Sequence, residues 1–133
     1  MKPLIDQLKE DEGFSATPYL CTAGHLTIGY GFNLDAGITE EEARIILINR
    51  VDELDSTLEK TFPWYTHLDS ARKDVIINMV YNLGLEKFKG FKRLIAALVI
   101  KDYITAAGEM LDSKWAVQVG DRAKRLAKVM RHE

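Results

Sequence analysis

Residues 14 to 33 constrain the fold most, because they interrupt a chain that otherwise has helical patterning. Three glycines break any helical run there: Gly24, Gly29 and Gly31. Apolar side chains alternate with small or polar ones in the same stretch, at Leu26, Ile28 and Tyr30. A repeat of two residues is the period of a β-strand, and glycines favour turns. We therefore predict a small β-hairpin region in this segment.

The segment before it has the period of a helix. Pro3 suits the first turn of a helix, and Gly13 suits its end. Four residues between them follow one another at helical spacing: Leu4, Ile5, Leu8 and Glu12. The spacing predicts a helix that ends near Glu12 and places this acid along its apolar stripe.

The segments after the hairpin region are also helical. Thr39 and Glu42 form a capping box at the start of a helix that Phe62 and Pro63 end. A second helix is predicted from Ser70 to Leu83, with Gly84 at the position after its end. We expect shorter helices at about 91–100, 103–112 and 121–131.

This order of elements predicts an α+β fold, with a small N-terminal β-hairpin lobe and a mainly helical C-terminal lobe. The chain has 133 residues and one cysteine, so we expect a single domain, residues 1–133, with no internal disulfide. A ligand cleft is expected between the lobes. Cysteines and histidines lack the spacing of zinc ligands, so no metal and no cofactor is predicted.

Charge and hydropathy limit the partners. The N-terminus has charged residues every few positions, so we expect neither a signal peptide nor stable membrane insertion. A net charge of −2 argues against nucleic-acid binding. Residues 122–131 are locally basic, and we interpret them as a solvated helix face rather than a phosphate-binding site.

Three acids crowd the end of the first helix: Glu10, Asp11 and Glu12. The helix dipole disfavours negative charge there by roughly 0.3–1 kcal/mol per group. The dipole, the adjacent acids and partial burial would each favour the protonated form of one carboxyl, as a general acid requires. Glu12 is the best candidate because it lies on the apolar stripe. The alternative is that the acids only make the helix end soluble.

The stretch EGFSATPYLCTAGHLTIGYG resembles the signature of the phage-type lysozymes of glycoside hydrolase family 24. That signature is Glu, eight residues, Asp or Cys, five residues, Thr, which corresponds here to Glu12, Cys21 and Thr27. The resemblance continues through NMVYNLG, KGFKRLIAAL and SKWAVQVGDRAKRLA, so it covers nearly the whole chain. It implies a lysozyme-like fold and a glycoside hydrolase.

The resemblance also implies roles for these residues. Glu12 would protonate the leaving oxygen of the β-1,4 bond between N-acetylmuramic acid and N-acetylglucosamine in peptidoglycan. The second position would activate water or stabilise charge on the sugar, and Thr27 would help to place that water. Arg122 matches an arginine that commonly pairs with the catalytic glutamate, and its alternative is a surface ion pair.

Cys21 departs from the commoner aspartate of the family. A free thiol has a pKa of about 8.5, so only a few per cent is thiolate at pH 7. Cys21 is then a weak base that shares its work with Thr27, a nucleophile when ionised, or a positional group. A small apolar thiol is the remaining alternative.

Four further residues match positions that line the family's sugar site: Gly31, Asn33, Tyr81 and Asn82. Gly31 would let the polysaccharide approach the backbone, although turn geometry alone also requires a glycine. Tyr81 is equally a candidate for the core. Trp64 and Trp115 are expected in the core with hydrogen-bond partners for their indoles, and His25 as an exposed turn residue.

The predicted function is that of an endolysin that hydrolyses peptidoglycan and causes host cell lysis. Two alternatives remain: a lytic transglycosylase that cleaves the same bond without water, and a module that binds peptidoglycan without cutting it. Without an export signal, such an enzyme would accumulate in the host cytoplasm. It would need a separate holin-type protein to reach the wall, and we expect it to act as a monomer.

Overall fold

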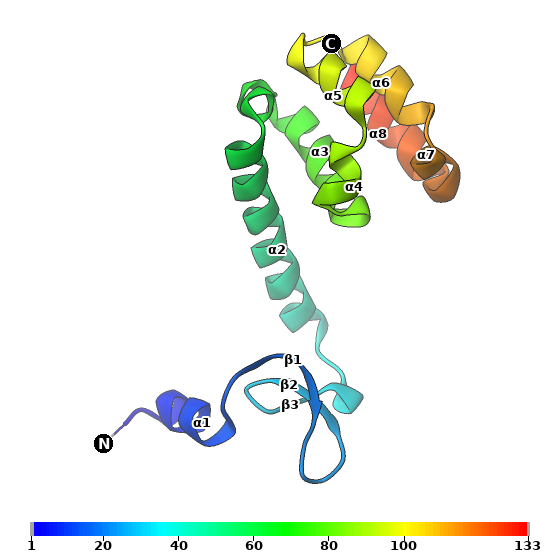
Figure 1. Ribbon diagram of the computed structural model, residues 1–133. Coiled ribbons are helices and arrows are strands. Elements are labelled where there is room, and N and C mark those ends of the chain that lie inside the picture. Colours follow the sequence, from blue (N-terminus) through cyan, green and yellow to red (C-terminus); the bar gives the residue numbers. More distant parts are fainter. Residues whose placement is uncertain (1, 133) are drawn as a thin grey trace. The chain divides into compact units, whose positions relative to one another are not determined.

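The computed structural model describes residues 2–132, and the chain divides after Leu47 into two compact units. We call them the N-terminal unit, up to Leu47, and the C-terminal unit, from Ile48; their elements are labelled in Figure 1. The boundary falls inside helix α2 (Glu40–Thr61). Each unit is described by itself, and the single domain and the cleft between lobes stay predictions.

The N-terminal unit contains one helix and a small antiparallel sheet. Helix α1 (Leu4–Glu12) is followed by β1 (Ser15–Leu20), β2 (Leu26–Gly29) and β3 (Phe32–Asn33), and then by the 3-10 turn η1 (Leu34–Ala36). The strands pair in the order β1-β2-β3. The predicted α+β fold is confirmed. The predicted hairpin has a third strand of two residues, which is too short to show alternation.

Burial in the N-terminal unit is concentrated at one residue. Thr27 is 3% exposed and is the only buried residue among those described in this unit. Helix α1 ends at Gly13 as predicted, but it buries none of its residues. Leu4, Ile5 and Leu8 are exposed. The apolar spacing therefore predicted the helix correctly, whereas the expected burial along its stripe is not found.

Helix α2 has the predicted start and end. Glu42 donates its backbone N–H to Thr39 Oγ1 at 3.1 Å, and Thr39 donates its N–H to Glu42 Oε1 at 2.9 Å. These reciprocal bonds are the capping box. The helix ends at Thr61, before Phe62 and Pro63. Leu58 is the one fully buried residue among those described in this helix.

The C-terminal unit is helical among its described residues and holds the apolar core. After α2 come η2 (Pro63–His67), α3 (Ser70–Leu83), α4 (Leu85–Lys89), α5 (Lys92–Val99), α6 (Tyr103–Leu111), α7 (Lys114–Val119) and α8 (Asp121–Arg131). Helix α6 packs against both α5 and α8 (Figure 1). The predicted helices are confirmed. The short elements η2, α4 and α7 were not predicted, because five or six residues show too little periodicity.

The core of this unit contains both tryptophans, as predicted. Trp115 is 2% exposed, and its indole N–H donates to Asn82 Oδ1 at 2.9 Å. Trp64 is 8% exposed and stacks on Phe62, with ring centroids 4.9 Å apart. Its indole N–H has no partner among the described residues, contrary to expectation. Between residues 2 and 132, no helix is long and apolar enough to cross a membrane.

The turn after α5 in the C-terminal unit contains a residue with a strained backbone conformation. Lys101 has φ +60° and is the only non-glycine residue with positive φ within the described chain. It follows α5, where its N–H donates to Leu98 O and the N–H of Asp102 donates to Ala97 O. These bonds are those of a Schellman motif, in which glycine is the usual residue at this position.

We expect Lys101→Gly to stabilise the protein. The left-handed conformation costs a residue with a Cβ roughly 1–2 kcal/mol, so the variant should raise the unfolding free energy by about 1 kcal/mol. Urea denaturation measures the change. Lys101→Ala is the matched control, because it removes the charge and keeps the Cβ; a gain of the same size there would contradict the explanation.

Candidate active site

The carboxyl group of Glu12 lies against Gly31. Glu12 is the last residue of α1, and Gly31 lies between β2 and β3 with φ +76°. A Cβ added to Gly31 would collide with Glu12 Oε2 and lie 2.9 Å from Glu12 Cδ. A side chain at this position would therefore force the Glu12 carboxylate, the end of a flexible side chain, to move. The structure places Gly31 beside the candidate proton donor, in addition to its predicted place in the sugar site.

Aromatic contacts join the end of α1 to the same turn. The rings of Phe14 and Tyr30 have centroids 5.5 Å apart, and Lys9 Nζ lies 5.6 Å from the centroid of Tyr30. These contacts connect residues that flank Glu12 with the residue before Gly31. The Glu12 side chain itself is exposed and makes no hydrogen bond among the described residues, so the expected partial burial is not found in this unit.

Cys21 and Thr27 are connected through one carbonyl group. The His25 carbonyl accepts hydrogen bonds from the backbone N–H of Cys21 at 3.0 Å and from Thr27 Oγ1 at 2.8 Å. The Thr27 hydroxyl proton is thereby used, so its oxygen is left to accept a hydrogen bond. A water molecule beside Thr27 can donate one. This arrangement is compatible with the predicted role of Thr27 in placing water.

The Cys21 thiol is partly exposed at the start of a tight turn, in which Gly24 donates its N–H to Cys21 O at 2.9 Å. Hydrogen bonds from the backbone of His25 and then Ala23 lower the pKa of this thiol below its ordinary value, and desolvation opposes them. The Thr27 side chain contributes less. Since Thr27 Oγ1 donates to the His25 carbonyl, we attribute the lowered pKa to the backbone. The turn thus favours the thiolate.

Asn33 lies directly across the sheet from Thr27. Its Oδ1 accepts a hydrogen bond from the N–H of Asp35 at 3.0 Å and thereby caps η1. The side-chain amide N–H groups remain free to donate, because no hydrogen bond among residues 2–132 uses them. Asn33 therefore has a structural role that the sequence did not indicate, and its contact with sugar stays a prediction.

Tyr81 and Asn82 lie at the end of α3 in the C-terminal unit. Asn82 accepts the hydrogen bond from Trp115, so this amide supports the core. Tyr81 is 50% exposed, which excludes the core role considered for it. It lines a surface pocket together with Arg50, Glu53 and Leu54. Substrate contacts of both residues stay predictions.

Arg122, in α8, is half-buried and is held by α3. Its Nε donates to Asn78 Oδ1 at 2.8 Å, and a second guanidinium nitrogen donates to Asn78 O at 3.4 Å. Asn78 was not predicted, although it begins the NMVYNLG segment. Within the described part of this unit no carboxylate pairs with Arg122. Its predicted pairing with Glu12 stays a prediction.

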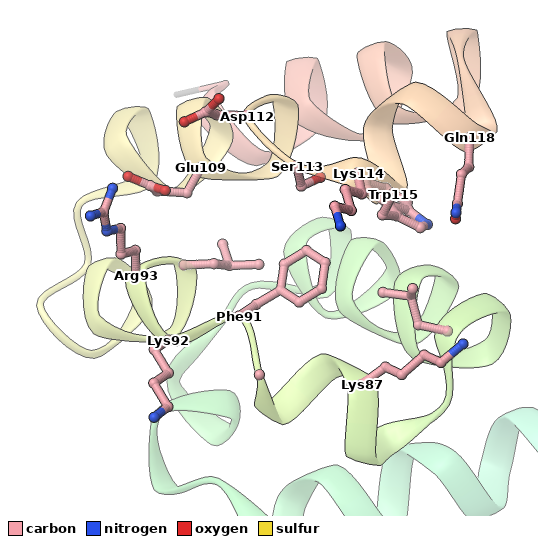
Figure 2. A pocket seen from close by; sticks show the side chains of 13 residues that line it. Lys87, Phe91, Lys92, Arg93, Glu109, Asp112, Ser113, Lys114, Trp115 and Gln118 are labelled. Atoms are coloured by element: carbon pink, nitrogen blue, oxygen red, sulfur yellow. The ribbon is translucent and has the colours of Figure 1, made fainter.

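A groove of about 610 Å³ lies in the C-terminal unit. Figure 2 shows the Phe91 ring directed into it between α4–α5 and α6–α7. Four cationic and two acidic side chains line it: Lys87, Lys92, Arg93, Lys114, Glu109 and Asp112. It could contact a ligand that carries charges of both signs. In residues 2–132, no cluster of His, Cys, Asp and Glu could hold a metal ion.

Sequence reasoning missed the role of one residue beside the signature, His25. His25 was expected only as an exposed turn residue, and it is exposed, but its carbonyl connects Cys21 with Thr27. Its Nδ1 also lies 3.8 Å from Asp35 Oδ2. A backbone acceptor has no signal in residue identity. The position of His25, between Cys21 and Thr27 in the sequence, was the available hint.

Comparison with known proteins supports the whole-chain resemblance. The phage lysozyme family model matches residues 9–133. Two proteins of Dictyostelium discoideum, named "Probable T4-type lysozyme 2" and "Probable T4-type lysozyme 1", are 28% and 29% identical over 95% and 94% of this chain and 92% and 91% of their own length. An "Endolysin" of Acyrthosiphon pisum secondary endosymbiont phage 1 is 31% identical over 82% of this chain and 74% of its own length.

Proposed function

The chain belongs to the phage lysozyme family, and we propose on this basis that it hydrolyses the β-1,4 bond between N-acetylmuramic acid and N-acetylglucosamine in bacterial peptidoglycan. The observation that carries the proposal is the position of the Glu12 carboxyl against Gly31, where an added Cβ would displace the carboxylate. In this proposal Glu12 donates its proton to the glycosidic oxygen as the bond to the sugar carbon breaks.

Cys21 and Thr27 act on water in this proposal. The Thr27 oxygen accepts a hydrogen bond from the attacking water, and the Cys21 thiolate accepts its proton as the new bond to carbon forms. The turn amides that lower the pKa of Cys21 support this role. Arg122 would hold the Glu12 side chain, and Asn33, Tyr81 and Asn82 would contact the sugars.

A lytic transglycosylase is the second candidate function. One observation favours it: the second signature position has a thiol, so no carboxylate activates water there. In that reaction a sugar hydroxyl of the substrate attacks instead, and a 1,6-anhydro end forms. The two functions use the same proton donor and differ in their products.

A reducing-end assay on purified peptidoglycan tests for hydrolysis. The native protein should release reducing ends, and Glu12→Gln should lower the rate by about a thousandfold, because general acid catalysis contributes about 10²–10⁴-fold. Glu10→Gln is the matched control, since this neighbouring acid pairs with Lys2 at the surface. Equal rates for native protein and Glu12→Gln would contradict the assignment of Glu12.

Substitutions of Cys21 test water activation. We expect Cys21→Asp to retain or raise the rate of hydrolysis, because a carboxylate is ionised at pH 7. Cys21→Ala should lower it by about tenfold or more, because it removes the base. The same reducing-end assay measures both. Equal activity in all three proteins would show that the thiol takes no part in the reaction.

We also propose that the protein acts as a monomeric endolysin that causes host cell lysis. It would accumulate in the host cytoplasm and reach the wall after a separate holin-type protein permeabilises the membrane. The relative named "Endolysin" supports this proposal. Expression alone should leave cells intact, and membrane disruption should then cause rapid lysis. Lysis of intact cells without it would contradict the dependence.

A further inference from the structure

His25 and Cys21 lie on the same face of the sheet. Tyr19 pairs with Thr27 in the register of β1 and β2, and the hydrogen bond from Cys21 N to His25 O continues this pairing beyond the strand ends. Cys21 is two residues after Tyr19, and His25 is two residues before Thr27. Because side chains alternate with a period of two, all four belong to one face. Residues directly opposite each other have Cβ atoms about 4.5–5.5 Å apart.

The carboxylate of Asp35 lies next to the imidazole of His25. Its Oδ2 lies 3.8 Å from His25 Nδ1, and its backbone N–H is held by Asn33 Oδ1 at 3.0 Å. Asn33 pairs with Thr27 in the sheet. The backbone pairings of Cys21 with His25 and of Thr27 with Asn33, and the proximity of Asp35 to His25, therefore place these five residues in one small region. With Nδ1 directed at Asp35, Nε2 is the nitrogen left for a second partner.

The proposed reaction needs the thiolate form of Cys21, and a histidine beside the thiol can supply it. A free thiol is mostly protonated at pH 7, so it is a poor substitute for the aspartate found elsewhere in the family. A nearby imidazole that takes the thiol proton removes this difficulty. We propose that His25 is a positioning residue for Cys21, oriented by Asp35, that accepts the thiol proton and leaves a thiolate beside Thr27.

The proton transfer is balanced without another reactant. The S–H bond of Cys21 breaks, its electron pair stays on sulfur, and the proton moves to Nε2 of His25, directly or through one water. The imidazolium that forms is stabilised by Asp35. One titratable group, Asp35 of η1, lies next to the His25 imidazole, and the register of β1 and β2 places two more, Cys21 and Tyr19, on the same face. The catalytic consequence rests on the proposed function, whereas the thiol chemistry does not.

Alkylation of Cys21 tests the pairing independently of activity. The rate with iodoacetamide, followed by mass spectrometry of the full chain from pH 5 to 10, reports the thiolate. We expect His25→Gln to slow alkylation at pH 7 by about tenfold, the change that one pKa unit produces, with no change at pH 10. Asp35→Asn should slow it less, and His67→Gln, an exposed histidine of η2, should leave it unchanged. Identical pH profiles for native protein and His25→Gln would overturn the proposal.

The same substitution made in a Cys21→Asp chain distinguishes a positioning role of His25 from a purely structural one. His25→Gln should lower hydrolysis in the native chain but not in a Cys21→Asp chain, because a carboxylate needs no proton acceptor at pH 7. Equal losses in both backgrounds would overturn the proposal in favour of a structural role. If the native protein releases no reducing ends, the proposed function fails, and the alkylation profiles still decide whether His25 pairs with Cys21.

Discussion

Gly31→Ala should abolish most hydrolysis while the protein stays folded. The added Cβ would collide with Glu12 Oε2, and at φ +76° the backbone leaves it no unstrained alternative. The carboxyl must therefore move away from its position. A displacement of about 1 Å in a catalytic group can cost about a hundredfold in rate, and we expect a loss of that size or more. The reducing-end assay measures it.

Gly37→Ala separates this collision from backbone strain. Gly37 has φ +77°, almost the same as Gly31, but a Cβ there meets nothing within 4 Å. Both variants should lose about 1–3 kcal/mol of stability, because both positions have a positive φ that a residue with a Cβ rarely adopts. Only Gly31→Ala should lose activity. A similar loss of activity in both variants would contradict the role of Gly31 as the seat of the Glu12 carboxyl.

Arg72→Ala should cause the largest loss of stability that we predict. Arg72 connects the start of α3 to the end of α8 by hydrogen bonds. Its Nε donates to Met130 O at 2.7 Å, and another guanidinium nitrogen donates to His132 O. The guanidinium also lies 3.9 Å from the Tyr103 ring centroid. Removing the side chain leaves both carbonyls without this donor and opens a gap over Tyr103, so we expect a loss of about 2–4 kcal/mol.

Urea denaturation measures this loss, with Lys124→Ala as the control. Lys124 is an exposed cation of α8 whose only ion pair among the described residues is with Asp121 at 3.9 Å. That variant should change the unfolding free energy by less than about 0.5 kcal/mol. If Arg72→Ala changed the unfolding free energy no more than Lys124→Ala, the contacts of Arg72 with α8 and Tyr103 would not stabilise the protein.

The long elements could be predicted because their local signals agree. The capping box of Thr39 and Glu42 and the final glycine of α3 are local features, and the structure has both. Burial depends on what packs against an element, which spacing alone does not specify. Ile46, Leu47 and Leu58 are apolar residues of the same helix, yet Ile46 and Leu47 are 42% and 45% exposed, whereas Leu58 is fully buried.

In the candidate site, too, the sequence predicted which residues take part but not the contacts between them. The signature identified Glu12, Cys21 and Thr27 by spacing alone. It did not show that the Glu12 carboxyl lies against Gly31, because that contact joins the end of a helix to a turn distant in the sequence. Nor did it show that one carbonyl connects Cys21 with Thr27, since a backbone acceptor is present in every residue.

Mass spectrometry of peptidoglycan fragments made in heavy-oxygen water tests the central claim most directly. The native protein should release N-acetylmuramic acid reducing ends that each carry one heavy oxygen atom from water, and Glu12→Gln should release almost none. Such ends would establish a muramidase that uses Glu12. Anhydro ends without label would contradict hydrolysis and identify a transglycosylase, and the absence of fragments from the native protein would contradict catalysis altogether.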